Sequence, residues 1–119
     1  MKKTLVIGAS ENPDRYAFKA MMSLKSHGHE AIGLGLKEGN VGGSKILTGK
    51  PQFTDIDTVT LYIGPAKHTE WMDYLIGLKP KRIIFNPGTE NPDFFTKATN
   101  SGIDCLEACT LVMLSIGNF

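Results

Sequence analysis

The chain alternates between short stretches rich in apolar residues, of which residues 4–7 form a continuous run, and segments in which apolar residues recur at helical spacing. Unbroken apolar runs are typical of strands that are buried on both faces of a sheet. The runs predict strands at residues 4–7, 30–34, 58–63, 82–85 and 103–107. Strands of this kind are expected in a sheet that is covered by helices on both sides.

Two of the predicted helices begin with the same three residue types. Asn12-Pro13-Asp14 offers an Asn side chain as cap, a Pro where no N–H is needed and an acid in the first turn. This helix is expected to end near Gly28, and the matching segment 91–93 opens a helix that ends near Gly102. Helical spacing predicts two more helices, at 71–78 and 110–116.

The regular alternation of strands and helices predicts the fold class. It indicates a parallel sheet with right-handed crossovers, which is an α/β, Rossmann-like, three-layer fold with about five strands. The glycine-rich stretch 35–49 is predicted as a loop, with a possible short edge strand at 45–48. With 119 residues, the whole chain 1–119 is expected to form a single domain.

Composition and charge narrow the classes of partner. The chain has 13 basic and 12 acidic side chains and a net charge of +1, so it lacks the excess of positive charge that nucleic-acid binding needs. No apolar stretch approaches the roughly 18 residues of a membrane span. We therefore expect neither a nucleic acid nor a membrane as partner, whereas a protein partner stays open.

The two cysteines, Cys105 and Cys109, lack nearby histidines in metal-ligand spacing and suggest no disulfide framework. The apolar run that follows the basic start ends at Ala9, too early for the core of a signal peptide. A reducing, cytoplasmic location is therefore expected, and no metal site is predicted.

The turn after the first strand is the strongest candidate for ligand binding. In sheets of this type, ligands bind outside the carboxyl ends of the strands. Gly8 to Asn12 joins the first strand to the first helix, so its N–H groups and the positive helix end can face a pyrophosphate. Ser10 and Asn12 would add side-chain donors, and Arg15 would neutralise phosphate charge. Only the first glycine of the dinucleotide fingerprint is present, so a plain tight turn is the alternative.

The end of the second strand distinguishes between nucleotides. Enzymes that use NAD place an acid there to bind the ribose hydroxyls. Residues 33–37 contain no carboxylate, whereas Lys37, Lys45 and Lys50 would suit a phosphorylated ribose. CoA and NADP therefore remain candidates and NAD becomes less favoured, with solvated loop lysines as the alternative.

Five parts of the chain together resemble a known family: Gly8 to Pro13, Arg15-Tyr16, Gly28 to Glu30, Asn86 to Asn91, and Cys109. They are similar to stand-alone bacterial CoA-binding domain proteins, which resemble the nucleotide-binding domain of succinyl-CoA synthetase. The resemblance implies binding of CoA or an acyl-CoA, with the pyrophosphate at Gly8 to Asn12 and with residues 63–65 and 86–88 along the nucleotide and pantetheine. The candidate binding residues are Gly8, Ala9, Ser10, Asn12, Arg15, Tyr16, Lys37, Ile63, Gly64, Pro65, Asn86, Pro87 and Gly88.

No catalytic constellation is recognisable. Glu107 is the one carboxylate that we place at the site, and a single acid does not make a mechanism. His27 and His29 are expected in a surface turn, and His68 is expected at an exposed helix position. A Cys109 thiolate could exchange with the CoA thiol, although a small buried cysteine is the alternative.

The sequence therefore predicts a non-catalytic or regulatory module that binds CoA or an acyl-CoA. Two alternatives from the enzyme class remain open. One is a small NADP-dependent oxidoreductase. The other is a detached acyl-CoA synthetase subunit that acts with a partner chain.

Overall fold

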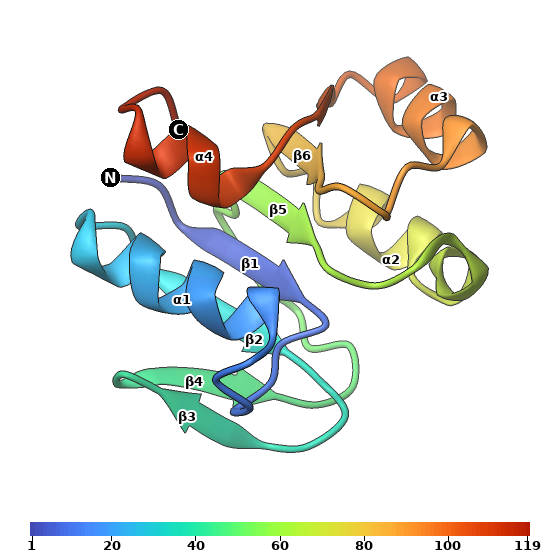
Figure 1. Ribbon diagram of the computed structural model, residues 1–119. Helices are drawn as coiled ribbons and strands as arrows, with labels where there is room; N and C mark the ends of the chain where they lie inside the picture. The colour runs from blue at the N-terminus through green and yellow to red at the C-terminus, as the bar shows by residue number, and fades with distance from the viewer.

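The central sheet has seven strands in the order β3-β4-β2-β1-β5-β6-β7, in a computed structural model that describes residues 1–119 (Figure 1). The strands are β1 (Thr4–Ile7), β2 (Ala31–Leu34), β3 (Gly39–Val41), β4 (Ser44–Leu47), β5 (Thr58–Leu61), β6 (Arg82–Phe85) and β7 (Asp104–Glu107). All neighbours are parallel except β3 and β4, which form an antiparallel hairpin. The α/β, Rossmann-like fold is confirmed, with seven strands instead of about five.

The two additional strands come from the glycine-rich stretch that was predicted mainly as a loop. Val41 and Ser44 are paired across a two-residue turn formed by Gly42 (φ +58°) and Gly43 (φ +93°). Both turn positions need positive φ, which glycine adopts without strain. The glycines therefore close a hairpin, and β4 extends the parallel sheet beside β2.

Helices cover both faces of the sheet (Figure 1). They are α1 (Tyr16–Ser26), the 3-10 helix η1 (Pro65–Glu70), α2 (Met72–Gly77), α3 (Pro92–Asn100) and α4 (Thr110–Ser115). α1 and α4 lie together on one face, and α2 and α3 lie on the other. None of these helices has the length and apolar character that a bilayer crossing requires.

The core is divided by the sheet because side chains alternate along each strand. Leu5 and Ile7 of β1 belong to the cluster that includes Phe94 of α3. Val6 points the other way, into the cluster that includes Met21 of α1. All four residues of β1 are fully buried, so the end of this strand lies in the interior of the sheet.

The two Asn-Pro-Asp segments have different local structures. Asn91 caps α3 as predicted, since its Oδ1 accepts a hydrogen bond of 3.2 Å from Phe94 N. The prediction that Asn12 caps the first helix is wrong: its Oδ1 accepts from Asp14 N at 3.0 Å in a turn that precedes α1. Ser10 Oγ accepts from Asn12 N in the same way, at 3.0 Å. Residues 10–14 therefore form two side-chain turns and are not helical, and α1 begins at Tyr16.

Candidate functional site

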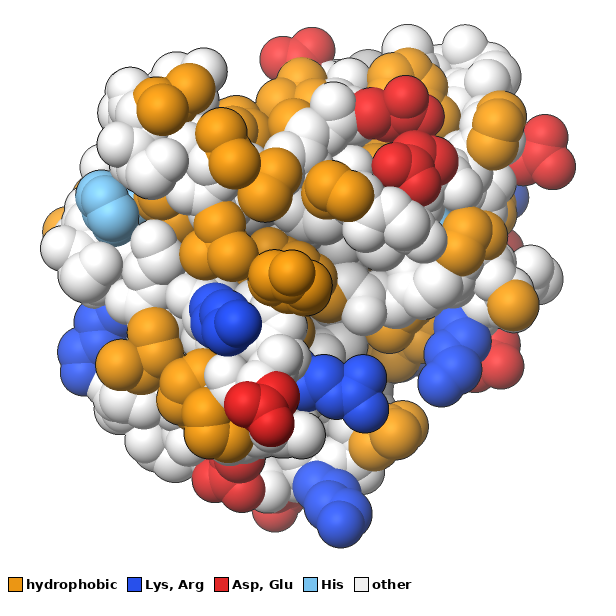
Figure 2. Space-filling view, viewed as in Figure 1, with side chains coloured by type: hydrophobic (Ala, Val, Ile, Leu, Met, Phe, Trp, Pro, Cys, Tyr) orange, Lys and Arg blue, Asp and Glu red, His pale blue; other side chains and the backbone are white.

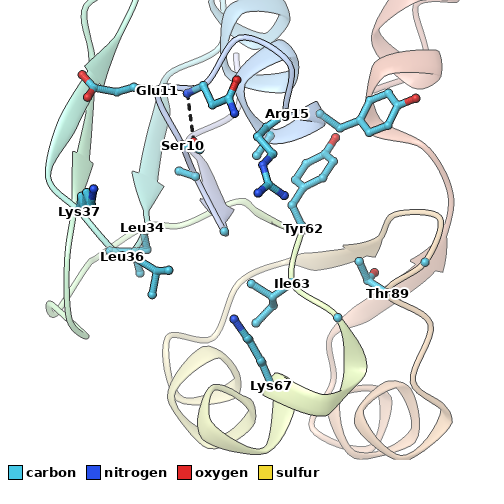
Figure 3. A pocket seen from close by; sticks show the side chains of 18 of the residues that line it. Ser10, Glu11, Arg15, Leu34, Leu36, Lys37, Tyr62, Ile63, Lys67 and Thr89 are labelled. Carbon is cyan, nitrogen blue, oxygen red and sulfur yellow. Dashed lines mark hydrogen bonds between the residues drawn. The ribbon is translucent and has the colours of Figure 1, made fainter.

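A cavity of about 920 Å³ opens at the carboxyl end of β1, between β2 and β5 (Figure 3). The strand order reverses at β1, because β2 lies on one side of it and β5 on the other, and doubly wound sheets hold ligands at such a point. On the same face, Figure 2 shows Lys and Arg side chains on either side of a hollow. The volume lies within the range of about 300–1,000 Å³ that is usual for small-molecule sites.

The cavity brings together most of the residues predicted from the sequence. Lining residues among them are Gly8, Ala9, Ser10, Asn12, Arg15, Tyr16, Lys37, Ile63, Gly64, Pro87 and Gly88. Pro65 and Asn86 do not line it. Pro65 is instead the first residue of η1. Whether the lining residues contact a ligand stays a prediction.

Close backbone contacts hold the loop after β1 in place. A Cβ atom on Gly35 would lie 2.3 Å from the carbonyl oxygen of Ala9, and one on Gly33 would lie 2.6 Å from Ala9 Cβ. On the other side, a Cβ atom on Gly8 would lie 2.8 Å from the carbonyl oxygen of Tyr62. The loop is therefore wedged between the ends of β2 and β5, and these glycines leave the room that it needs.

Only part of the loop can offer its N–H groups to a ligand. Gly8 N and Ala9 N both donate to the Leu34 carbonyl oxygen, each at 2.9 Å. The backbone N–H groups of Ser10 and Glu11 have no partner within the protein. The prediction that the whole turn presents bare amides is therefore wrong for Gly8 and Ala9, whose amides tie the loop to β2.

The start of α1 adds unpaired donors to the same cavity. The N–H groups of Tyr16, Ala17 and Phe18 lie in its first turn and have no partner, and the N-cap residue Arg15 provides no side-chain cap. These groups carry the positive end of the helix dipole. Figure 3 shows the Arg15 guanidinium pointing into the cavity. This corner of the cavity is therefore suited to an anion.

Three cationic side chains surround the cavity. Arg15 precedes α1, Lys37 follows β2, and Lys67 lies in η1. Figure 3 shows Lys67 reaching into the cavity from the side opposite Arg15. Lys67 was missed from the sequence, although it lies shortly after a strand end. Lys45 and Lys50 do not line the cavity, so of the three predicted lysines only Lys37 faces this site.

The carboxylates at the cavity differ from the predicted one. Glu11 and Asp14 line it, whereas Glu107 does not. The placement of Glu107 at the site is therefore wrong, because β7 is the edge strand and two strands separate it from β1. Glu11 turns away from the cavity centre: its Oε2 accepts a 2.9 Å hydrogen bond from Asn40 N in β3 (Figure 3).

His68 is fully buried, so its predicted exposed position is wrong. Asn91 Nδ2 donates to His68 Nδ1 at 3.0 Å, which leaves the ring proton on Nε2, and Nε2 donates to the carbonyl oxygen of Ile63 at 2.9 Å. The ring packs edge-on against Phe94. His68 therefore connects the segment after β5 to Asn91, the cap of α3. Its burial comes from contacts with residues distant in the sequence, which the spacing of residues around it does not indicate.

Asn86 is also an internal residue. Its Nδ2 donates to Thr60 Oγ1 at 2.6 Å and to the Leu61 carbonyl oxygen at 2.8 Å, and its Oδ1 accepts from Thr110 N at 2.9 Å. Thr60 Oγ1 lies 2.8 Å from Thr110 Oγ1. The side chain thus connects β5, β6 and α4, and its predicted place among the ligand-binding residues is not supported.

Tyr62 lines the cavity, but its hydroxyl is buried and has no hydrogen-bond partner. Burial, with a smaller contribution from Cys109, raises the pKa of Tyr62 to about 12, even though the Thr60 and Thr110 hydroxyls act in the opposite direction. Cys109 itself is half-buried and free. Its proposed exchange with a ligand thiol stays a prediction.

Tyr62→Phe should increase the free energy of unfolding in urea by about 1 kcal/mol, because it removes a buried polar atom that has no partner. In the wild type, stability should also fall between pH 10 and pH 12, since tyrosine ionises near 10 when unfolded and near 12 when folded. The variant should lose less stability over this range, and the loss that remains comes from Tyr74, whose pKa burial also raises. Tyr16→Phe, at a 67% exposed site, is the control that should change neither quantity. A destabilised Tyr62→Phe would show that the hydroxyl has a partner.

Comparison with known proteins shows the family and the fold of the chain. A family model described as a CoA binding domain matches residues 2–115. The crystal structure of an uncharacterized protein is similar over 100% of this chain and 98% of its own, with 50% identity and a TM-score of 0.96. No curated protein gives a significant match.

Two structures from Pyrococcus species are less similar to this chain. A hypothetical protein from Pyrococcus horikoshii is 27% identical, with a TM-score of 0.84, over 97% of this chain and 82% of its own. A conserved hypothetical protein from Pyrococcus furiosus is 20% identical, with a TM-score of 0.77, over 92% and 93%; this likeness shows the fold alone. Because the family model spans nearly the whole chain, the protein belongs to the CoA binding domain family.

Proposed function

We propose that the protein binds CoA or an acyl-CoA in the cavity at the end of β1. The diphosphate lies against the Gly8–Asn12 turn and the first turn of α1. The observation that carries this proposal is the convergence of unpaired amides, at Ser10 and Glu11 and at the start of α1, with the Arg15 guanidinium on one corner of the cavity. Fixed N–H donors and a guanidinium are the groups that bind phosphate best.

The lysines support CoA over NAD. Lys37 follows β2 at the position where a ribose would lie, and no carboxylate competes with it at residues 33–37. A 3'-phosphate on the ribose would find its counter-charge there. The 91% exposed Leu36 next to it offers apolar surface for the base.

We propose binding, and not catalysis, as the role of this chain, with any reaction left to a protein partner. The titratable side chains near the cavity support this role. His68 is buried and already hydrogen-bonded to Ile63 and Asn91, and the raised pKa of Tyr62 keeps its phenol protonated near neutral pH. Neither group is placed to move a proton on a ligand. The free cysteines fit the reducing, cytoplasmic location expected from the sequence.

A thermal-shift panel with CoA, acetyl-CoA, dephospho-CoA, NAD, NADP and ATP tests this function. A ligand at a hundredfold its dissociation constant adds about 2.7 kcal/mol to stability. CoA should raise the melting temperature more than dephospho-CoA does, and NAD should leave it unchanged. Ser10→Asp should abolish the CoA shift, because its carboxylate would face the phosphates. Ser115→Asp, which adds the same charge on α4, is the matched control.

Two outcomes would contradict the proposal. A shift with NADP but not with CoA would favour the oxidoreductase alternative. An undiminished CoA shift in Ser10→Asp would place the diphosphate elsewhere.

A further inference from the structure

Glu11 carries a negative charge in the very loop that is proposed to hold the diphosphate. Its side chain does not face the cavity but reaches across to the hairpin, where Oε2 accepts from Asn40 N at 2.9 Å (Figure 3). β3 is the edge strand of the sheet, so this N–H has no strand partner on that side. The Glu11 carboxylate therefore joins the loop after β1 (residues 8–12, the phosphate loop) to the β3–β4 hairpin.

The neighbouring residue is adapted to this contact. A Cβ atom on Gly39 would lie 2.5 Å from Glu11 Cδ and 2.8 Å from Oε2. Gly39 thus leaves the space that the carboxylate occupies. Its φ lies outside the left-handed region, so the need for glycine here comes from this close approach and not from the backbone conformation.

The contact closes one end of the segment that carries Lys37. Gly35 N donates to the Leu47 carbonyl oxygen at 3.0 Å, which fixes the start of the segment on β4. At its other end Gly39 is paired with Ile46 of β4, and the Glu11–Asn40 hydrogen bond ties this end to the loop after β1. Leu36 and Lys37 line the cavity between these two points. Glu11 therefore links the loop after β1 directly to the segment that carries Lys37.

We infer that Glu11 is a positioning residue for the ligand, which holds the 36–38 segment so that Lys37 faces the ribose phosphate. This inference rests on the proposed CoA binding. It runs against the simple electrostatic expectation, because an acid beside a polyanion should weaken binding and its removal should strengthen binding. The two views therefore predict effects of opposite sign.

Three variants separate charge from positioning. Glu11→Gln removes the charge but keeps an oxygen that can accept from Asn40 N. Glu11→Ala removes both the charge and the acceptor. Gly39→Ala keeps the charge but places a methyl group where the carboxylate lies. Melting temperatures without ligand check that each variant is folded.

The dissociation constants for CoA and dephospho-CoA should be measured by calorimetry. Glu11→Ala and Gly39→Ala should bind CoA about fivefold more weakly than Glu11→Gln, which should bind at least as tightly as the wild type. The loss should be smaller for dephospho-CoA, and Lys37→Ala should cost little more in the Glu11→Ala background. Faster amide exchange at Asn40 in Glu11→Ala would report the lost hydrogen bond without any ligand.

Equal CoA affinity of Glu11→Ala and Glu11→Gln, or tighter binding by Glu11→Ala, would overturn the positioning role and leave the proposed function intact. A wild-type protein that binds no CoA would overturn the proposed function and the positioning role together.

Discussion

Gly35→Ala should lower the free energy of unfolding by about 3 kcal/mol and weaken CoA binding by at least about tenfold. The new Cβ atom would lie 2.3 Å from the carbonyl oxygen of Ala9 and 3.2 Å from Ile46 Cγ2. The first contact is with backbone, so no side-chain rotation relieves it. The phosphate loop itself would have to move, and the amides of Ser10 and Glu11 would move with it.

The matched control for this prediction is Gly64→Ala. Gly64 lines the same cavity and has φ −68°, but a Cβ atom there would meet no other atom within 4 Å. Urea unfolding should therefore show little change for this variant. If Gly35→Ala were as stable as Gly64→Ala and bound CoA as tightly as the wild type, the loop would not be wedged against β2.

Asn86→Ala should cost about 3–4 kcal/mol of stability. The substitution leaves Thr110 N and the Leu61 carbonyl oxygen without partners in a buried site, and it also removes the bond to Thr60 Oγ1. Each unpaired buried group loses its hydration without compensation. Because Asn86 does not line the cavity, the folded protein should still bind CoA.

Urea unfolding with and without CoA checks this prediction, with Asn100→Ala as control. Asn100 is exposed near the end of α3 and makes no side-chain hydrogen bond, so its replacement should change stability little. A stable Asn86→Ala that had lost CoA binding would restore Asn86 to the ligand-binding residues.

The central strands of the sheet were predictable from the sequence because they are buried on both faces. Runs such as Thr4 to Ile7 and Arg82 to Phe85 have the unbroken apolar character that only such strands need. Of the hairpin, β4 was foreseen as a possible edge strand at 45–48, whereas β3 was missed. Glycine is a poor strand former, and the positive φ of Gly42 and Gly43 that closes the turn is known only from the structure.

The position of the candidate site was predictable because it follows from the topology, but the individual contacts were not. Asn12 and Asn91 begin the same tripeptide, yet only Asn91 caps a helix. The partners that decide the outcome, such as His68 for Asn91, lie far away in the sequence. In the same way, nothing near Glu107 indicates that its strand lies at the sheet edge.

The wedging of the phosphate loop between β2 and β5 bears on the thermodynamics of association. A loop that already holds its shape surrenders no conformational freedom when a nucleotide arrives, so more of the contact energy remains as affinity. In the binding mode proposed above, no lid would need to close at this corner, and encounter with the anion would be the slow step. The glycines at the strand ends thus act as preorganising elements.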